Sequence, residues 1–142
     1  MAGESNKSVV LLSIQPKFAQ MILNGQKRVE FRKTKFRREV SHVVLYVSTP
    51  IQKVIGYFEI SYLDEDSPRK LWSKYYRIGG ILYDEFSKYF ESSKKGLAIG
   101  IGKIRVFTYP KNLFSIDTEM RAPQSYLYLA KKDFNKITKY KI

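Results

Sequence analysis

Hydrophobic and polar positions alternate along the chain with two different periods, which predicts short strands and short helices following one another. Residues 9–14 form a continuous apolar run, typical of a strand that is buried on both faces. Residues 16–23 then carry apolar side chains at helical spacing, and Pro16 suits the first turn of a helix because it has no N–H to leave unpaired. Asn24-Gly25 favours a helix end, since both residues tolerate the left-handed backbone of a C-terminal cap.

Charged and apolar residues alternate with a period of two just after this turn, over residues 28–32. Apolar Val29 and Phe31 therefore share one face of the expected strand. The other face carries only charged side chains: Arg28, Glu30 and Arg32. Lys27 lies at the mouth of the turn. An ordinary surface strand rarely carries three charges on one side, so this face is the first candidate for a functional site.

The rest of the pattern predicts further strands at residues 42–48, 53–63, 97–108 and 125–130. Helices are expected at residues 69–76 and 82–90, the first capped by Ser67-Pro68 and ended by Gly79-Gly80. The short connection at Thr49-Pro50 favours an antiparallel hairpin. We therefore expect an α+β fold, a small mixed or mostly antiparallel β-barrel with two or three short helices, whose closure would hide the sheet edges.

The length of 142 residues and the apolar fraction of 44% predict one globular domain. We place its core at about residues 9–130 and a basic C-terminal tail at residues 131–142. The lack of cysteine excludes disulfides and thiolate metal sites, and a single histidine, His42, argues against a zinc enzyme. We therefore predict no metal and no cofactor.

No apolar run approaches the ~20 residues that a membrane-spanning helix requires. The first residues also lack the apolar stretch of a secretory signal. Both features predict a cytoplasmic protein that does not enter a membrane. The oligomeric state stays open.

The charge changes this picture most, because the sequence contains 26 lysines and arginines but only 13 acidic residues. A net charge of +13 attracts polyanions, with nucleic acid the first choice and an acidic membrane surface the second. The basic residues gather in the tail from Lys131 and in residues 27–38. The second group comprises Lys27, Arg28, Arg32, Lys33, Lys35, Arg37 and Arg38. The alternative is a solvated face that provides solubility alone.

Aromatic residues also lie among cations at residues 69–77. Trp72 fits a core anchor better than a ligand contact, because large aromatic side chains are mostly buried. Tyr76, beside Arg77, is the better candidate for stacking on a nucleic-acid base.

An ordered set of residues resembles the opening of the ASCH family, which belongs to the PUA-like superfamily of small β-barrels. The set comprises Ser13, Ile14, Pro16, Ala19, Ile22, Leu23, Gly25, Lys27, Glu30 and Arg32. Later segments continue the likeness, which spans roughly residues 9–130. The resemblance implies a PUA-like fold with a cleft between the first helix and the barrel. It also implies either binding of RNA or other nucleic acid, or hydrolysis of modified nucleosides.

The resemblance further implies roles for individual residues. In the acetylcytidine amidohydrolase branch of the family, the lysine at the position of Lys27 is catalytic, with a threonine three residues later and a separate glutamate. This chain carries Glu30 at the threonine position, and Glu59 is our guess for the separate glutamate. Ser125, with Gln124, would add polar groups to the same cleft.

Two functions from different classes therefore stand. In the first, the chain is a module for RNA or single-stranded nucleic acid whose basic cleft grips phosphates. In the second, it is a small amidohydrolase that uses Lys27, with a lowered pKa, together with Glu30 on an acylated nucleoside. Glu30 could orient its basic neighbours, accept a hydrogen bond from a base edge, or act as general base. A regulatory domain that recruits other proteins is a third, weaker reading.

Overall fold

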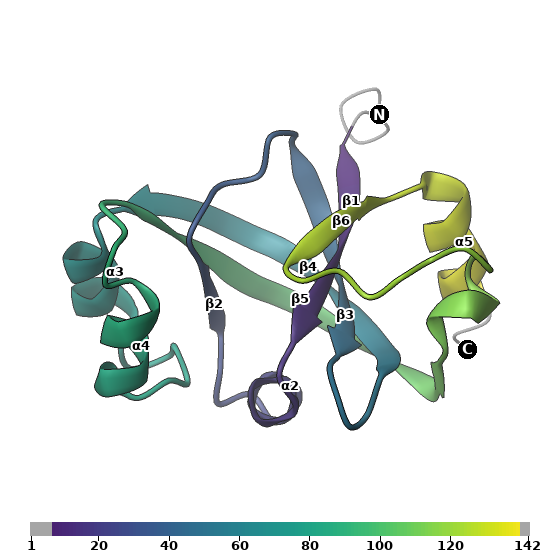
Figure 1. The fold of residues 1–142 in the computed structure, drawn as a ribbon, viewed down its shortest axis with the longest axis horizontal. Coiled ribbons are helices and arrows are strands. Elements are labelled where there is room, and N and C mark those ends of the chain that lie inside the picture. The colour runs from purple at the N-terminus through teal and green to yellow at the C-terminus, as the bar shows by residue number, and fades with distance from the viewer. Residues whose placement is uncertain (1–6, 140–142) are drawn as a thin grey trace.

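The computed structural model describes residues 7–139 as one sheet flanked by short helices (Figure 1). The order along the chain is β1 (Ser8–Ile14), α2 (Pro16–Leu23), β2 (Val29–Arg32), β3 (Val40–Val47), β4 (Lys53–Asp66), α3 (Pro68–Tyr75), α4 (Tyr83–Tyr89), β5 (Gly96–Lys111), a 3-10 turn (Leu113–Ser115), β6 (Tyr126–Leu129) and α5 (Lys131–Lys139). Every predicted strand and helix is present. The hairpin expected at Thr49-Pro50 is antiparallel, as β3 and β4 show.

The sheet has the strand order β2-β5-β4-β3-β1-β6. β1 and β3 run parallel, and the other neighbouring strands run antiparallel. This mixed sheet confirms the predicted α+β class. The expected closure of the ladder is not seen in residues 7–139, where β2 and β6 remain as edges. Both edge strands are only four residues long, so few backbone groups are left unpaired at either edge.

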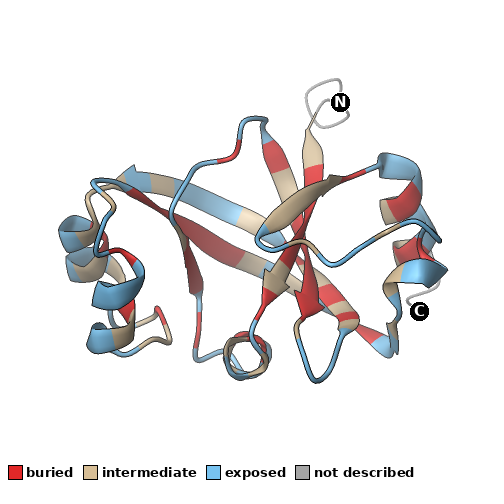
Figure 2. Ribbon diagram, viewed as in Figure 1, coloured by how far each residue is buried: buried red, intermediate tan, exposed pale blue. Residues whose placement is uncertain are grey.

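The hydrophobic core lies on both faces of the sheet, and β1 explains why. Val10 and Leu12 belong to one core cluster, whereas Val9 and Leu11 belong to the cluster on the opposite face. Alternate side chains of a strand point to opposite faces, so a continuous apolar run fills both. Figure 2 shows long buried stretches in β1 and in its neighbour β3.

The first helix follows its sequence signals closely. Pro16 occupies the first turn of α2, and Asn24 caps its C-terminal end. Gly25 then adopts a φ of +85°, a left-handed conformation that favours glycine. Ala19 and Ile22 bury the inner face of α2. The turn after this helix leads into β2, and the side chain of Lys27 in this turn points into the protein.

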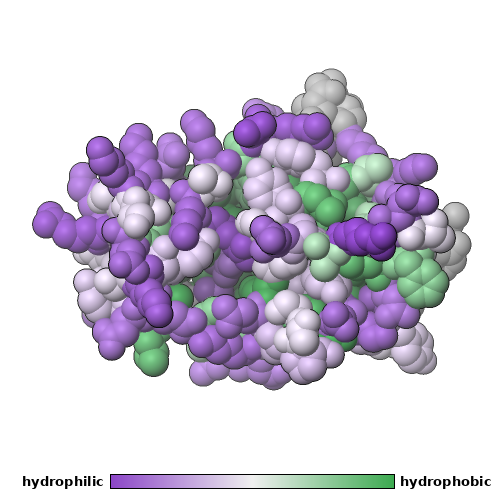
Figure 3. Space-filling view, viewed as in Figure 1, coloured by the Kyte–Doolittle hydropathy of each residue, from purple (hydrophilic) through white to green (hydrophobic). Residues whose placement is uncertain are grey.

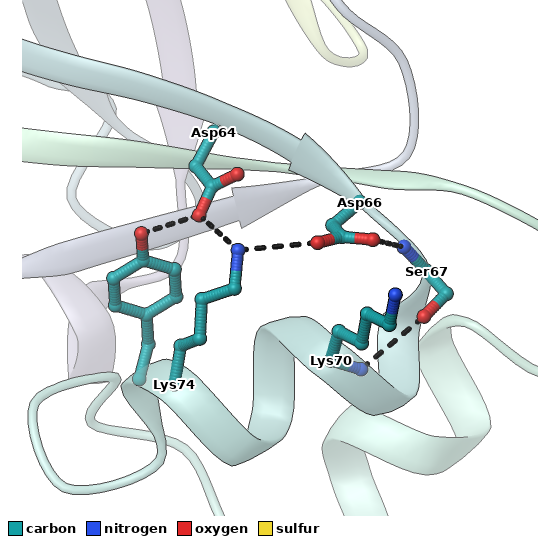
Figure 4. Close-up of polar contacts among 6 residues, drawn as sticks. Asp64, Asp66, Ser67, Lys70 and Lys74 are labelled. Atoms are coloured by element: carbon teal, nitrogen blue, oxygen red, sulfur yellow. Dashed lines mark hydrogen bonds and ion pairs between the residues drawn. The ribbon is translucent and has the colours of Figure 1, made fainter.

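A polar cluster fixes α3 against the end of β4 (Figure 4). The Lys74 ammonium lies 2.8 Å from the Asp64 carboxylate and 3.1 Å from that of Asp66. The Tyr75 O–H donates to Asp64 over 2.5 Å. Burial, followed by this hydrogen bond, raises the pKa of Tyr75 to about 12. The hydrogen bonds from Lys74 and Tyr75 in turn lower the pKa of Asp64.

The expected basic tail begins as the helix α5, which the hydrophobic pattern did not predict. Ile137 is buried and Phe134 is half-buried, and both pack on the core cluster that contains Val9. Residues 140–142 of the expected tail lie outside the described residues. Among residues 7–139, no helix is both long enough and apolar enough to cross a membrane.

Candidate functional site

A cavity of about 370 Å³ opens where β1 and β3 end, between α2, β2, α4 and the segment that precedes β6. Its aromatic walls come from four different elements and are Phe18, Phe31, Tyr46 and Tyr89. Lys27 and Glu30 also line this cavity. This is the cleft beside the first helix that the family resemblance implied, and we call it the first cavity.

Lys27 is almost fully buried in the wall of the first cavity, with 2% of its surface exposed. Its ammonium donates to the carbonyl oxygen of Gly79 over 2.6 Å and lies 3.3 Å from Glu30 Oε1. The ring of Phe18 lies 5.0 Å from the same nitrogen, within cation–π range. Burial lowers the pKa of Lys27, and the charge of Glu30 opposes this shift only in part.

The glycine pair after α3 allows the chain to approach Lys27 this closely. Gly80 has a φ of +63°, and a Cβ placed there would lie 2.8 Å from the Cβ of Lys27. Both the backbone conformation and the contact therefore favour glycine. From the sequence, we interpreted Gly79-Gly80 only as a helix end, so the partner of Lys27 was missed.

Arg32 connects three segments around the first cavity. Its Nε donates to Glu30 Oε2 over 2.9 Å, and its terminal nitrogens donate to the Ser13 carbonyl over 2.7 Å and to Ser125 Oγ over 3.3 Å. Glu30, with 6% of its surface exposed, thus lies between two cations. We call Lys27, Glu30 and Arg32 the ionic triad. The structure brings these three predicted residues together, with Ser125 beside them.

Glu59, our guess for the separate glutamate, lies on β4, which contributes no residue to the first cavity. Glu59 is exposed on β4 and does not line the first cavity, so that guess is wrong. Glu85 of α4 does line it and forms an ion pair with Lys17 of α2 over 2.9 Å. Its charge also acts weakly on Lys27. No sequence signal marked Glu85, because it lies on the polar side of an ordinary amphipathic helix.

The predicted basic residues after the triad line the outside of the fold. The basic segment, residues 33–38 between β2 and β3, exposes four side chains: Lys33, Lys35, Arg37 and Arg38. Tyr128 holds this segment in place, because its hydroxyl accepts the N–H groups of Arg37 and Arg38 over 3.0 and 3.2 Å. Phe36 anchors it from below as part of the core. Hydrophilic side chains cover most of the left half of the face in Figure 3, over α3, α4 and β2.

Arg28 and Tyr76 do not line the first cavity. Arg28 is exposed just before β2, so the period of two that we extended back to it does not apply. Tyr76 is 46% exposed at the end of α3, where Arg77 donates to its hydroxyl over 3.1 Å. Trp72 packs on Phe86 with ring centroids 5.0 Å apart, in line with a core-anchoring role.

The chemical groups of the site are an amine, carboxylates and a guanidinium. Within residues 7–139, no three His, Cys, Asp or Glu side chains are grouped so that they could hold a metal ion. A buried amine with a lowered pKa can accept a proton, and a carboxylate and a guanidinium accept and donate hydrogen bonds to a polar ligand. The arrangement therefore suits recognition of a polar ligand and proton transfer.

Known proteins resemble this chain over most of its length. An "ASCH domain-containing ribonuclease" of Zymomonas mobilis is 28% identical over 142 residues, covering 96% of this chain and 95% of its own length. The ATP synthase subunit alpha of Ureaplasma parvum is 30% identical over 129 residues, or 89% of this chain, although the chain spans only 16% of that relative. The crystal structure of ASCH from Zymomonas mobilis matches with a TM-score of 0.85 at 27% identity, covering 93% of this chain and 94% of that one. A family model, the ASCH domain, matches residues 12–105. This match spans more than half of the chain, which therefore belongs to the ASCH domain family.

Proposed function

We propose that this protein binds single-stranded RNA, with one nucleotide in the first cavity and the adjoining phosphates along the basic segment. The observation that carries the proposal is that the first cavity and the basic segment adjoin each other. Arg32 lines the first cavity, and the exposed cations of residues 33–38 follow directly after it. The Zymomonas mobilis relative that carries the name ribonuclease supports RNA as the polymer.

The first cavity suits the base of a nucleotide for two reasons. Single-stranded RNA is recognised mainly by stacking on aromatic side chains and by hydrogen bonds to base edges. Aromatic rings of Phe18, Phe31 and Tyr89 line the cavity, and the Glu30 carboxylate offers an acceptor for an exocyclic amine. The buried triad selects what enters the cavity, while the exposed segment supplies affinity without sequence preference.

Binding and its salt dependence test this proposal with a labelled single-stranded octanucleotide. Each phosphate contact contributes about 0.7 to the slope of log affinity against log salt for a single strand. We expect Lys35→Ala/Arg37→Ala to weaken binding and to lower that slope by about 1.4. The matched control is Lys94→Ala/Lys95→Ala, since both lysines are exposed and do not line the first cavity. No binding by the wild type at low salt, or equal effects of the two double variants, would overturn the proposal.

Hydrolysis is a second candidate function, and the environment of Lys27 favours it. The lowered pKa makes its amine available as a base or nucleophile, with Glu30 and Glu85 as nearby carboxylates. The substrate would be either the RNA itself or a small acylated nucleoside. In the amidohydrolase reaction, the Lys27 amine would take a proton from a water whose oxygen adds to the acyl carbon; the C–N bond then breaks, the carboxylic acid is released, and the nucleoside amine leaves with the proton.

Two substrates and one variant distinguish these possibilities. The wild type and Lys27→Arg are incubated separately with single-stranded RNA and with acetylcytidine, and the products are separated by chromatography. Turnover that is lost in Lys27→Arg identifies an enzyme, and the substrate that is consumed identifies the reaction. RNA binding without any turnover contradicts the hydrolytic function and leaves the binding function in place.

A further inference from the structure

A second cavity, of about 400 Å³, lies at the opposite end of the β1–β3 pair from the first. The first cavity is lined by Ser13 and Ile14 at the end of β1, whereas the second is lined by Lys7 and Val9 at its start. At about 3.3 Å per strand residue, the two lie roughly 20 Å apart. The first residues of β1, β3 and α5, which border the second cavity, all lie in the upper half of the view in Figure 1.

The side chains around the second cavity combine positive charge, aromatic rings and hydrogen-bond acceptors. The charge comes from Lys7, which directly precedes β1, and from Lys131 at the start of α5. His42 and Phe134 have ring centroids 5.3 Å apart, tilted by 42°. Glu59, which pairs with His42 across β3 and β4, supplies a carboxylate at the rim. These are the groups that bind a nucleotide: cations for the phosphate, rings for the base, and an acceptor for an exocyclic amine or a 2′-hydroxyl.

The basic segment connects the two cavities along the chain. It begins after Arg32, which lines the first cavity, and leads to Val40 and Ser41, which line the second. Its exposed cations therefore follow the route that a strand would take from one cavity to the other. Contacts with Tyr128 and burial of Phe36 keep this route in a fixed shape.

We propose that the second cavity is a second nucleotide subsite, so that one RNA strand is held at both ends of the basic segment. This inference rests on the proposed RNA binding and adds a length requirement to it. Even a fully stacked strand rises about 3.4 Å per nucleotide, so an octanucleotide reaches across roughly 20 Å and a dinucleotide does not.

The imidazole of His42 gives a direct readout, because it is the only histidine of the chain. We expect an unlabelled octanucleotide to shift the carbon-bound ring proton signal of His42 in a two-dimensional NMR spectrum as the RNA saturates the protein. A signal that stays in place while the octanucleotide is fully bound would overturn the second subsite.

A charge reversal at the rim tests the same subsite through affinity. Lys7→Glu/Lys131→Glu should weaken octanucleotide binding about tenfold and lower its salt slope by about 1.4, while leaving dinucleotide affinity unchanged. Lys94→Glu/Lys95→Glu makes the same change of charge at exposed positions that line neither cavity. A loss no larger than in this control, in protein with the wild-type circular dichroism spectrum, contradicts the inference.

The two proposals fail in different ways. If the wild type binds no RNA at low salt, the proposed function fails and the second subsite fails with it. If RNA binds and depends on Lys35 and Arg37 while the His42 signal and the rim variant show no effect, only the second subsite fails.

Discussion

A terminal guanidinium nitrogen of Arg32 lies 3.3 Å from Ser125 Oγ, although the strands next to these residues form opposite edges of the sheet. The same guanidinium donates to the Ser13 carbonyl at the end of β1. Arg32 thus links the β2 edge to the β6 edge across the first cavity. This side chain therefore connects the two edges of the open sheet, which no strand pairing joins within residues 7–139. Three of its five N–H donors have partners within the protein, which favours a role in shaping the site.

Replacing Arg32 by lysine tests this bridging role. A lysine keeps the charge but cannot reach Glu30, Ser13 and Ser125 at once, because its ammonium is a single point of donation. We expect Arg32→Lys to lower the free energy of unfolding by about 1–3 kcal/mol, measured by urea denaturation. Arg37→Lys, an exposed position in the basic segment, is the control and should change it by less than about 0.5 kcal/mol. Equal losses in both variants would contradict the bridge.

Glu30 should matter more to stability than Lys27, because it lies between two cations. Glu30→Gln leaves Lys27 and Arg32 together without a compensating charge, and we expect a loss of about 3–5 kcal/mol. Lys27→Met removes a buried amine of similar length and leaves Glu30 paired with Arg32, so the loss should be less than half as large. Chemical denaturation gives both values, with exposed Glu91→Gln as reference. The opposite order would show that Lys27 is the stabilising partner.

Substitution of two glycines distinguishes the cost of backbone strain from the cost of a steric clash at the site. Gly25 and Gly80 both have positive φ, of +85° and +63°. A Cβ at Gly25 meets no atom within 4 Å, whereas one at Gly80 would lie 2.8 Å from the Cβ of Lys27. Gly25→Ala should therefore cost about 1–2 kcal/mol from strain alone. Gly80→Ala should cost more and also weaken RNA binding, which fluorescence anisotropy measures. Equal stability losses with unchanged binding would show that the Gly80 contact is unimportant.

Burial of Tyr75 and its hydrogen bond to Asp64 together raise the pKa of this tyrosine, so we expect stability to fall at alkaline pH. The folded state raises the pKa of Tyr75 to about 12, compared with about 10 for an unfolded chain. Between these values the unfolded state has released a proton that the folded state keeps, so this contribution to stability is lost as the pH rises from 10 towards 12. Wild type should exceed Tyr75→Phe by about 1 kcal/mol at pH 8, and by clearly less at pH 10.5. Exposed Tyr109→Phe serves as control, and a constant difference for Tyr75→Phe across this range would contradict the hydrogen bond.

Most of the secondary structure could be predicted because most elements carry local signals. The apolar run of β1, the proline at the start of α2 and the cap at Ser67 act within a few residues, so pattern and propensity suffice. The helix α5 was missed because its lysines dominate the sequence, whereas only Phe134 and Ile137 pack inward. The predicted ASCH resemblance is confirmed by the family match.

The site could be predicted only in part, because its contacts join distant segments. Period-two alternation placed Glu30 and Arg32 on one side of a strand, but it could not show that α2, α4 and the segment before β6 enclose that side. The Lys27 acceptor, Gly79, lies 52 residues further along the chain. Glu85 lines the first cavity because of the way α4 packs. Nothing in its local sequence distinguished it from a surface residue.

The central claim is that a nucleotide of single-stranded RNA enters the first cavity beside the ionic triad. Photocrosslinking tests it most directly, with octanucleotides that carry one 4-thiouridine at successive positions, followed by peptide mapping with mass spectrometry. The account predicts crosslinks at one RNA position to the cavity walls, at Phe18, Phe31 or Tyr89. Crosslinks confined to the exposed aromatic residues of α3, with none in the cavity walls at any position, would contradict it.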